Sequence, residues 1–152
     1  MEVGYYPEII LAGRKLNDSM GKYVANEIIN LMTKKRIQVV DSNILVMGLT
    51  FKENCPDTRN SKVVDMANML ASFHTSIDVY DPYVDEMDVP GGMKANFIKN
   101  PEKGAYDCII LAVKHSLFIE MGSEKIRNFG KEKHVLFDLK YAFDASEADG
   151  RL

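Results

Sequence analysis

The apolar run from Ile44 to Leu49 and the polar stretch after it constrain the fold more than any other part of the chain. The run is nearly continuous, which is typical of a strand buried on both faces of a parallel sheet. The following loop, residues 50–60, reads TFKENCPDTRN, and a helical pattern begins near Ser61. A strand, a polar loop and a helix in this order predict an open α/β sheet, in which ligands bind beside the carboxyl ends of the strands.

Strand-like and helix-like patterns continue to alternate along the chain. Further strands are expected at Ile77–Tyr80, Ala95–Ile98, Tyr106–Val113 and Val135–Leu139, with a helix over residues 116–129 between the last two. This alternation predicts an α/β fold, namely a Rossmann-like doubly wound parallel sheet of about five strands with helices on both faces. The polar end of the chain, residues 144–152, is expected to fray.

A long amphipathic helix is expected before the sheet, because residues 12–36 contain no proline and carry apolar residues at helical spacing. These are Leu16, Met20, Val24, Ile28 and Leu31, with Tyr23, Ile29 and Met32 beside them. Such a helix spans about 36 Å, which exceeds what one small domain usually covers. We therefore expect part of it to pack on a second copy of the chain, the alternative being an ordinary core helix. The predicted division is residues 1–41, a linker and dimerisation helix, and residues 42–152, a Rossmann-like domain.

Composition limits the classes of partner. The 152-residue chain has a formal net charge of -3, which argues against a nucleic-acid-binding protein. No apolar run approaches the roughly 20 residues that cross a bilayer, and the first residues lack a signal-peptide layout. The prediction is a cytoplasmic protein without a membrane partner. Cys55 and Cys108 lie far apart in sequence, which indicates neither a disulfide framework nor a metal site.

Two cations in the first loop indicate an anionic ligand. Lys52 carries a flexible ammonium, Arg59 offers a fixed fork of donors that matches a diphosphate, and the start of the next helix adds a positive dipole end. The alternative is a surface salt bridge for each, Lys52 with Glu53 and Arg59 with Asp57. The residues alone therefore predict an anion or nucleotide site, or a charged surface.

Several other residues invite chemical roles. Phe51 is expected to bury its ring and anchor the loop. Cys55 has no histidine near it in sequence and is not interpreted as a nucleophile, while Cys108 is expected to be an inert core thiol. Asp81 follows the second strand, where an acid can bind a ribose, but Asp81-Pro82 is interpreted as a turn. His115 is interpreted as a loop histidine rather than a proton shuttle.

The stretch GLTFKENCPDTRNSK, residues 48–62, resembles the signature that opens the C-terminal domain of the UDP-glucose/GDP-mannose dehydrogenases. The pairs F-K and P-D-x-R, and the small residue at the helix start, carry the likeness. The segment AGRKLND, residues 12–18, is similar to an A-x-R-x-x-N-D run of the same family, and the likeness extends from Gly4 to about Phe143. The nearest branch oxidises UDP-N-acetylhexosamines to uronic acids.

The resemblance implies roles for four residues. Lys52 would reach toward the UDP-sugar, and Arg59 would contact bound NAD from across the cleft. Arg14 would lie near a homodimer interface and the sugar-phosphate side of the substrate, with a solvated helix charge as the alternative. Lys140 would approach the substrate, although Tyr141 departs from the basic or small residue of some relatives.

The family implies an NAD-dependent enzyme that oxidises the sugar C6 alcohol to a carboxylate in two steps, for surface polysaccharide synthesis. This sequence holds neither G-x-G-x-x-G nor the G-G-x-C motif of the family's catalytic cysteine. We therefore expect a C-terminal fragment that binds UDP-sugar and dimerises, has no catalytic residue, and depends on a missing N-terminal domain for most of its contacts to NAD. The alternative is a non-enzymatic nucleotide-binding regulatory module. A receiver domain is disfavoured because Gly48–Lys52 lacks the acids that such domains carry after the first strand.

Overall fold

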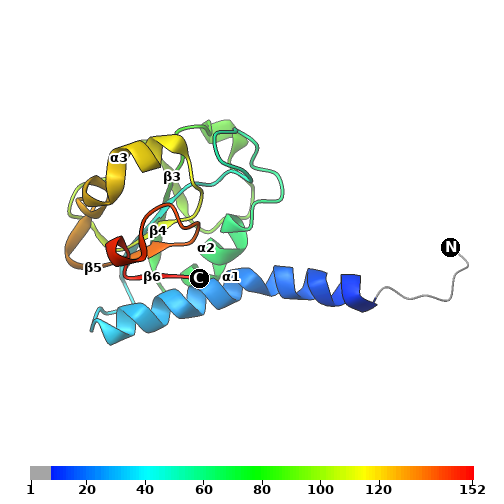
Figure 1. Cartoon of the computed structure of the whole chain (residues 1–152), viewed down its shortest axis with the longest axis horizontal. Helices are drawn as coiled ribbons and strands as arrows, with labels where there is room; N and C mark the ends of the chain where they lie inside the picture. Colours follow the sequence, from blue (N-terminus) through cyan, green and yellow to red (C-terminus); the bar gives the residue numbers. More distant parts are fainter. Residues whose placement is uncertain (1–7) are drawn as a thin grey trace, which may run out of the picture.

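A six-stranded parallel sheet forms the centre of the molecule (Figure 1). The computed structural model describes the backbone of residues 8–152 and the side chains of residues 19–152. The strands are β1 (Asn43–Met47), β2 (Ser76–Tyr80), β3 (Asn96–Ile98), β4 (Tyr106–Leu111), β5 (Gly130–Asp138) and β6 (Gly150–Arg151). Every neighbouring pair is parallel, in the order β3-β2-β1-β4-β5-β6. The order reverses between β1 and β4, and such a reversal opens a crevice at the carboxyl ends of the two strands.

In the described part of the chain, three α-helices cover the sheet: α1 (Glu8–Lys34), α2 (Val63–Ala71) and α3 (Ser116–Arg127). Alternate residues of the strands face opposite layers, as strand geometry requires. Ile44, Val46 and Ile110 pack with α1 and α2, whereas Leu45 and Met47 pack with α3. The predicted doubly wound α/β fold is confirmed.

Residues 144–152 were expected to fray, but the structure shows them ordered. A short 3-10 helix, Ala145–Glu147, leads into β6, which is the strand beyond the expected five. Asp149 lies between them and accepts hydrogen bonds from Leu136 N (2.7 Å), Lys35 Nζ and Arg127 Nη1 (3.1 Å). The amide belongs to β5, and the two cations lie at the ends of α1 and α3. The terminal segment is therefore held by one backbone hydrogen bond and two ion pairs to other elements.

Helix α1 begins and ends earlier than expected and has 27 residues. Val24, Ala25, Ile28 and Met32 are buried in the core, which confirms the inner stripe of the predicted amphipathic pattern. Tyr23, expected to widen that stripe, is 54% exposed. The amino-terminal part of α1 runs past the sheet and the other helices (Figure 1). The side chains of Arg14 and Leu16, and residues 4–7 entirely, lie outside the described part.

The chain leaves β1 through Gly48, and only glycine fits there. Its φ is +103°, and a Cβ at this position would lie 2.5 Å from Cβ of Val113 at the end of β4. The amide of Gly48 still donates to the carbonyl of Tyr80 (2.8 Å), which extends the β1–β2 pairing by one residue. The tight exit brings residues 49–54 directly over the carboxyl ends of β1 and β4.

Candidate functional site

A pocket of about 300 Å³ lies at the carboxyl edge of the sheet, on the side of α1 and α2. Loops after β1, β4 and β5 form one part of its wall, and helices α1 and α2 form another. Its lining includes Thr50, Phe51, Lys62, Lys114 and Lys140. The pocket thus combines three lysines with an apolar floor that Val24, Val63, Met66 and Val113 supply. Such a combination can accept an anion attached to an apolar or planar group.

Asp81 holds the loop after β1 in place. This buried carboxylate follows β2, and its Oδ2 accepts hydrogen bonds from the amides of Leu49 (2.7 Å) and Thr50 (3.2 Å). Its other oxygen accepts from the amide of Tyr83 at 2.8 Å. Asp81 is therefore not only the turn residue expected from Asp81-Pro82, because its carboxylate also binds two amides of the loop after β1.

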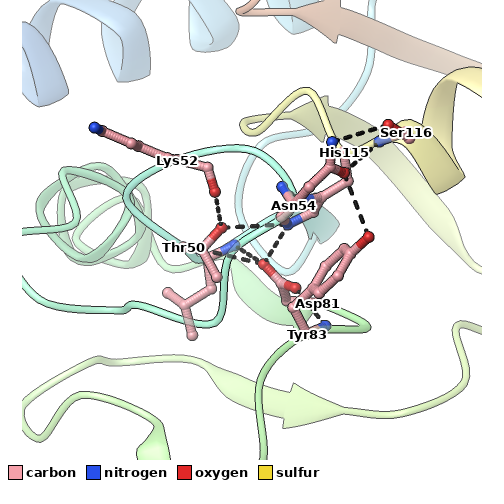
Figure 2. Close-up of polar contacts among 8 residues, drawn as sticks. Thr50, Lys52, Asn54, Asp81, Tyr83, His115 and Ser116 are labelled. Carbon is pink, nitrogen blue, oxygen red and sulfur yellow. Dashed lines mark hydrogen bonds and ion pairs between the residues drawn. The ribbon is translucent and has the colours of Figure 1, made fainter.

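His115 is the second buried polar group of this edge (Figure 2). Its Nε2 lies 2.9 Å from Asp81 Oδ2 and 3.3 Å from Thr50 Oγ1, and its Nδ1 accepts from the amide of Asn54 at 2.9 Å. The ring packs between Tyr83 (centroids 4.7 Å apart) and Phe118 (5.3 Å). The loop histidine expected from sequence is thus a fully buried connection between three loops.

Asn54 completes the contact between this loop and α3. Its Oδ1 accepts from the amide of Ser116 (2.9 Å), and its Nδ2 donates to Ser116 Oγ (2.9 Å). Tyr83 Oη also donates to Asn54 Oδ1, at 3.3 Å. Because the first amides of a helix have no partner within it, Asn54 caps α3 from a different loop.

Asp138, at the end of β5, organises the loop that carries Lys140. Its buried carboxylate accepts from the amides of Lys140 (3.3 Å), Ala142 (3.1 Å) and Phe143 (2.9 Å). Asp81 and Asp138 therefore use the same arrangement at two strand ends, since each carboxylate binds the amides of a loop over the sheet.

The structure places Lys52, Arg59 and Lys140 in loops at the carboxyl edge of the sheet but does not bring them together. Lys140 lines the pocket, whereas Lys52 is exposed and extends away from the His115 cluster (Figure 2). Lys52 Nζ lies 5.9 Å from the ring centroid of Phe51. That ring is 56% exposed, so the expectation that Phe51 buries itself is wrong. Of Arg14, only the position on α1 is described.

Arg59 forms the ion pair that was the alternative interpretation. Its Nη2 and Nε each lie 3.0 Å from a different oxygen of Asp57, and the Arg59 side chain is 86% exposed. The hydrogen bond from Arg59 lowers the pKa of Asp57 to about 2, and the same bond raises the pKa of Arg59. A ligand at Arg59 would have to share the guanidinium with Asp57 or displace it.

Burial of Asp81 by itself would raise the pKa of its carboxyl group, but hydrogen bonds from His115, Leu49 and Tyr83 outweigh it and bring the pKa below its ordinary value. The carboxylate is thus held ionised beside the imidazole. Burial also raises the pKa of Cys108, a core thiol as expected. Cys55 is half-buried in the loop after β1 and has no disulfide partner.

Among the described residues, no group of three or more potential metal-ligating side chains lies together. No helix in this part of the chain combines the length and apolar character required to cross a bilayer.

Sequence reasoning missed Asp81 and His115 as organising residues. The signal available was weak: both are polar residues at the ends of apolar strand patterns, where parallel strands bring their termini together. Nothing in the sequence indicated that they contact each other, because 34 positions separate them.

Residues 45–145 match the family model for the UDP-binding domain of the UDP-glucose/GDP-mannose dehydrogenases. The chain belongs to this family. The matched residues begin in β1 and end at the first residue of the 3-10 helix, so they include the pocket-lining loops after β1, β4 and β5. The resemblance expected from GLTFKENCPDTRNSK is therefore confirmed, as a C-terminal domain of the family.

Relatives within the family match almost the whole chain. A UDP-N-acetyl-D-glucosamine 6-dehydrogenase of Pseudomonas aeruginosa is 53% identical over 150 residues, which are 99% of this chain and 36% of the relative. The enzyme of the same name from Salmonella typhi is 49% identical, over 99% of this chain and 35% of the relative. The chain thus spans about a third of the length of these relatives.

Solved structures of the family share the fold at lower identity. An NDP-N-acetyl-D-galactosaminuronic acid dehydrogenase of Methanosarcina mazei aligns with a TM-score of 0.79 at 21% identity, over 97% of this chain and 30% of that one. A UDP-D-ManNAc dehydrogenase of Pyrococcus horikoshii aligns with a TM-score of 0.75 at 21% identity, over 95% and 32%.

Proposed function

We propose that this chain is the UDP-sugar-binding part of an NAD-dependent nucleotide-sugar 6-dehydrogenase, which converts a UDP-N-acetylhexosamine to its uronic acid. One observation carries the proposal: the residues that match the UDP-binding family model include the loops that line the pocket, where the strand order reverses between β1 and β4. The names of the two relatives at 53% and 49% identity support the choice of a UDP-N-acetylhexosamine.

The lining of the pocket suits a nucleoside diphosphate. Lys114 and Lys140 supply positive charge from the ends of β4 and β5, and the apolar floor of α1 and α2 side chains can receive a flat base. Lys52 stands on the same edge and reaches toward the phosphates or the sugar in this proposal. Arg14, on the part of α1 that precedes the pocket, would approach the sugar-phosphate side.

NAD would be held mainly by residues outside this chain. The strand–loop–helix unit β1–α2 has no glycine fingerprint, and 15 residues separate the end of β1 from the start of α2, so it forms no short diphosphate-binding turn. The exposed guanidinium of Arg59 can supply one contact to an NAD molecule bound by another domain. When bound, NAD would accept hydride from the sugar C6. The residues of this chain would bind and orient the nucleotide and exclude water from it.

Two further features belong to the proposal. The projecting end of α1 would pair with a second copy, which gives a homodimer. The uronic acid product would serve surface polysaccharide synthesis, and the protein would act in the cytoplasm. The dimer is supported by the length of α1 beyond the sheet. The role in polysaccharide synthesis and the cytoplasmic location follow from the family resemblance.

Calorimetry with UDP tests the binding role. We expect Lys52→Ala and Lys140→Ala each to weaken UDP binding about fivefold, since an exposed ion pair contributes up to about 1 kcal/mol. Arg59→Ala should leave UDP affinity unchanged, and exposed Lys103, which precedes β4 at the opposite edge, provides a control as Lys103→Ala. A parent chain that does not bind UDP, or equal affinity in all variants, would contradict the assignment.

Activity requires a second experiment. Joined to the remaining part of such a relative, this chain should support reduction of NAD by UDP-N-acetylglucosamine. The 152-residue chain alone should form no NADH, since its sequence contains no G-G-x-C cysteine. NADH formation by the isolated chain would refute that expectation, whereas UDP binding in a natural protein without a dehydrogenase domain would favour a regulatory module.

A further inference from the structure

Loop 50–54 has two sides with different partners. Thr50, Phe51 and Glu53 line the pocket. Asn54, at the end of the same loop, donates its amide hydrogen to His115 Nδ1 at 2.9 Å. His115 is fully buried behind the loop and is not part of the pocket lining. The imidazole therefore contacts the wall of the pocket without contacting a ligand inside it.

The hydrogen bonds determine where the imidazole carries its proton. A backbone N–H can only donate, so Nδ1 must accept and cannot bear hydrogen. Nε2 then carries the proton and donates to Asp81 Oδ2, 2.9 Å away. Thr50 Oγ1 lies 3.3 Å from the same nitrogen and donates its own hydrogen to the carbonyl of Lys52 at 2.7 Å. All four contacts are satisfied only by a neutral ring protonated at Nε2.

The groups that face the ring come from three segments of the chain: the loop after β1, the loop after β2 and α3. Asp81, after β2, and Tyr83, in the following loop, are the titratable ones among the described contacts. Thr50 and Asn54 from the loop after β1, and Phe118 from α3, are uncharged. A second proton on Nδ1 would point at the amide hydrogen of Asn54. Although Asp81 attracts the added charge, the hydrogen bond to the loop must break.

We propose that His115 is a positioning residue that, as a neutral Nε2–H imidazole, holds loop 50–54 as a wall of the nucleotide pocket, and that a proton added at Nδ1 releases the loop. That the pocket binds a nucleotide rests on the proposed function. The restraint of loop 50–54 by His115 does not depend on it, because this restraint can be measured without any ligand.

Nitrogen NMR of the ligand-free 152-residue chain tests the restraint directly. At pH 7 the ring nitrogens of His115 should show the Nε2–H tautomer. On acidification, the amide signal of Asn54 should move with the same midpoint as the ring. An Nδ1–H tautomer or an imidazolium at pH 7 would overturn the proposal. An Asn54 amide signal that does not change while the ring is protonated would also overturn it.

A matched pair of variants separates the two sides of the imidazole. In His115→Asn, the amide oxygen lies near the place of Nδ1 and can accept from Asn54. In His115→Gln, the amide nitrogen lies near the place of Nε2 and can donate to Asp81, while the bond to Asn54 is lost. We expect His115→Asn to keep UDP affinity within about twofold and His115→Gln to weaken it about fivefold to tenfold, as expected for one lost hydrogen bond.

Ser116→Ala is the control, since it removes only the contact of Asn54 Nδ2 with Ser116 Oγ and leaves both ring nitrogens paired. It should bind UDP within about twofold of the parent if one exposed bond is worth little. Parental affinity in His115→Gln would overturn the proposal. A parent chain that does not bind UDP would refute the proposed function alone, because the NMR titration still decides the role of His115.

Discussion

Buried carboxylates at strand ends are the residues that shape this edge of the molecule. Asp81 and Asp138 each end a buried strand, and each binds backbone amides of a loop that covers the sheet. A carboxylate that is buried without partners is costly, whereas one that accepts several amide hydrogen bonds is retained in its ionised form. The loops around the pocket are therefore determined by groups that lie beneath them.

The pH dependence of stability should reveal Asp81 together with Asp149, the carboxylate that precedes β6. Asp81 and Asp149 have pKa values below the ordinary 3.8 in the folded chain, so the unfolded chain takes up protons first as the pH falls. Their contribution is complete above about pH 5 and is lost as the pH falls through the folded pKa values. Urea denaturation from pH 6 to pH 2.5 should show this decline, and Asp81→Asn should make it shallower.

Exposed Asp85 supplies the comparison for that measurement. Asp85→Asn should leave the pH profile close to that of the parent. If Asp81→Asn instead followed the parental profile at every pH, Asp81 would not be an ionised anchor of the loop.

Gly48 combines a positive φ with a crowded position. Alanine there must adopt φ near +103° and place its Cβ 2.5 Å from Val113 Cβ. We expect Gly48→Ala to lower the free energy of unfolding by about 2–4 kcal/mol, from backbone strain together with overpacking. Chemical denaturation measures this, with Gly91→Ala as the control because no atom lies within 4 Å of the added carbon. Equal stability of the two variants would refute this account of the β1 exit.

Among the elements, α1 combines two kinds of surface. Its carboxyl-terminal part supplies Val24, Ile28 and Met32 to the core, and Gly21 lets it approach α2 closely, since a Cβ there would lie 3.2 Å from Asp65 Cβ. Its amino-terminal part runs beyond the sheet (Figure 1). Tyr23 lies on this helix directly before the buried Val24 and is 54% exposed.

A change at Tyr23 tests whether α1 carries the proposed dimer. Sedimentation of the chain should give a mass near that of two copies at micromolar concentration. Tyr23→Glu should weaken association about tenfold or more, because it places a charge on an apolar contact. Asn30→Glu, seven residues further along α1 where the helix lies beside the domain, should have little effect. A monomeric parent chain would contradict the dimer.

At the scale of the whole molecule, Asp149 links elements from both ends of the chain. It pairs with Lys35 at the end of α1 and with Arg127 at the end of α3, and it receives the amide of Leu136 from β5. The side chain of Asp149 is only 18% exposed. One carboxylate thus attaches the last strand to the two helical layers on opposite faces of the sheet.

Removal of this carboxylate should destabilise the whole chain rather than its end alone. We expect Asp149→Ala to lower the free energy of unfolding by about 2–4 kcal/mol, because two cations and an amide lose a partly buried partner. Thermal and urea denaturation should report a single transition at a lower midpoint. Glu120→Gln, on an exposed position of α3, is the control; a parental midpoint for Asp149→Ala would show that the link is not needed.

Local patterns predicted the first five strands and the inner face of α1, because apolar periodicity is a property of neighbouring residues, but they did not predict β6. The run at Ile44–Leu49 and the alternation after it identified the parallel sheet, and the stripe of Val24 and Ile28 identified the inner face of α1. The same reasoning failed for Phe51, which was expected inside and is 56% exposed. An apolar residue in a loop has no periodic partner that would indicate which way it faces.

The sequence by itself determined the parallel α/β fold and the family, because apolar periodicity and a long motif are local properties of the chain. The tertiary structure alone decided which polar residues hold that edge together. Asp81 meets His115, and Asp149 meets Lys35, across 34 and 114 positions. Such pairs form only when parallel strands bring distant ends together, since a charged group is buried only where its partners are already in place.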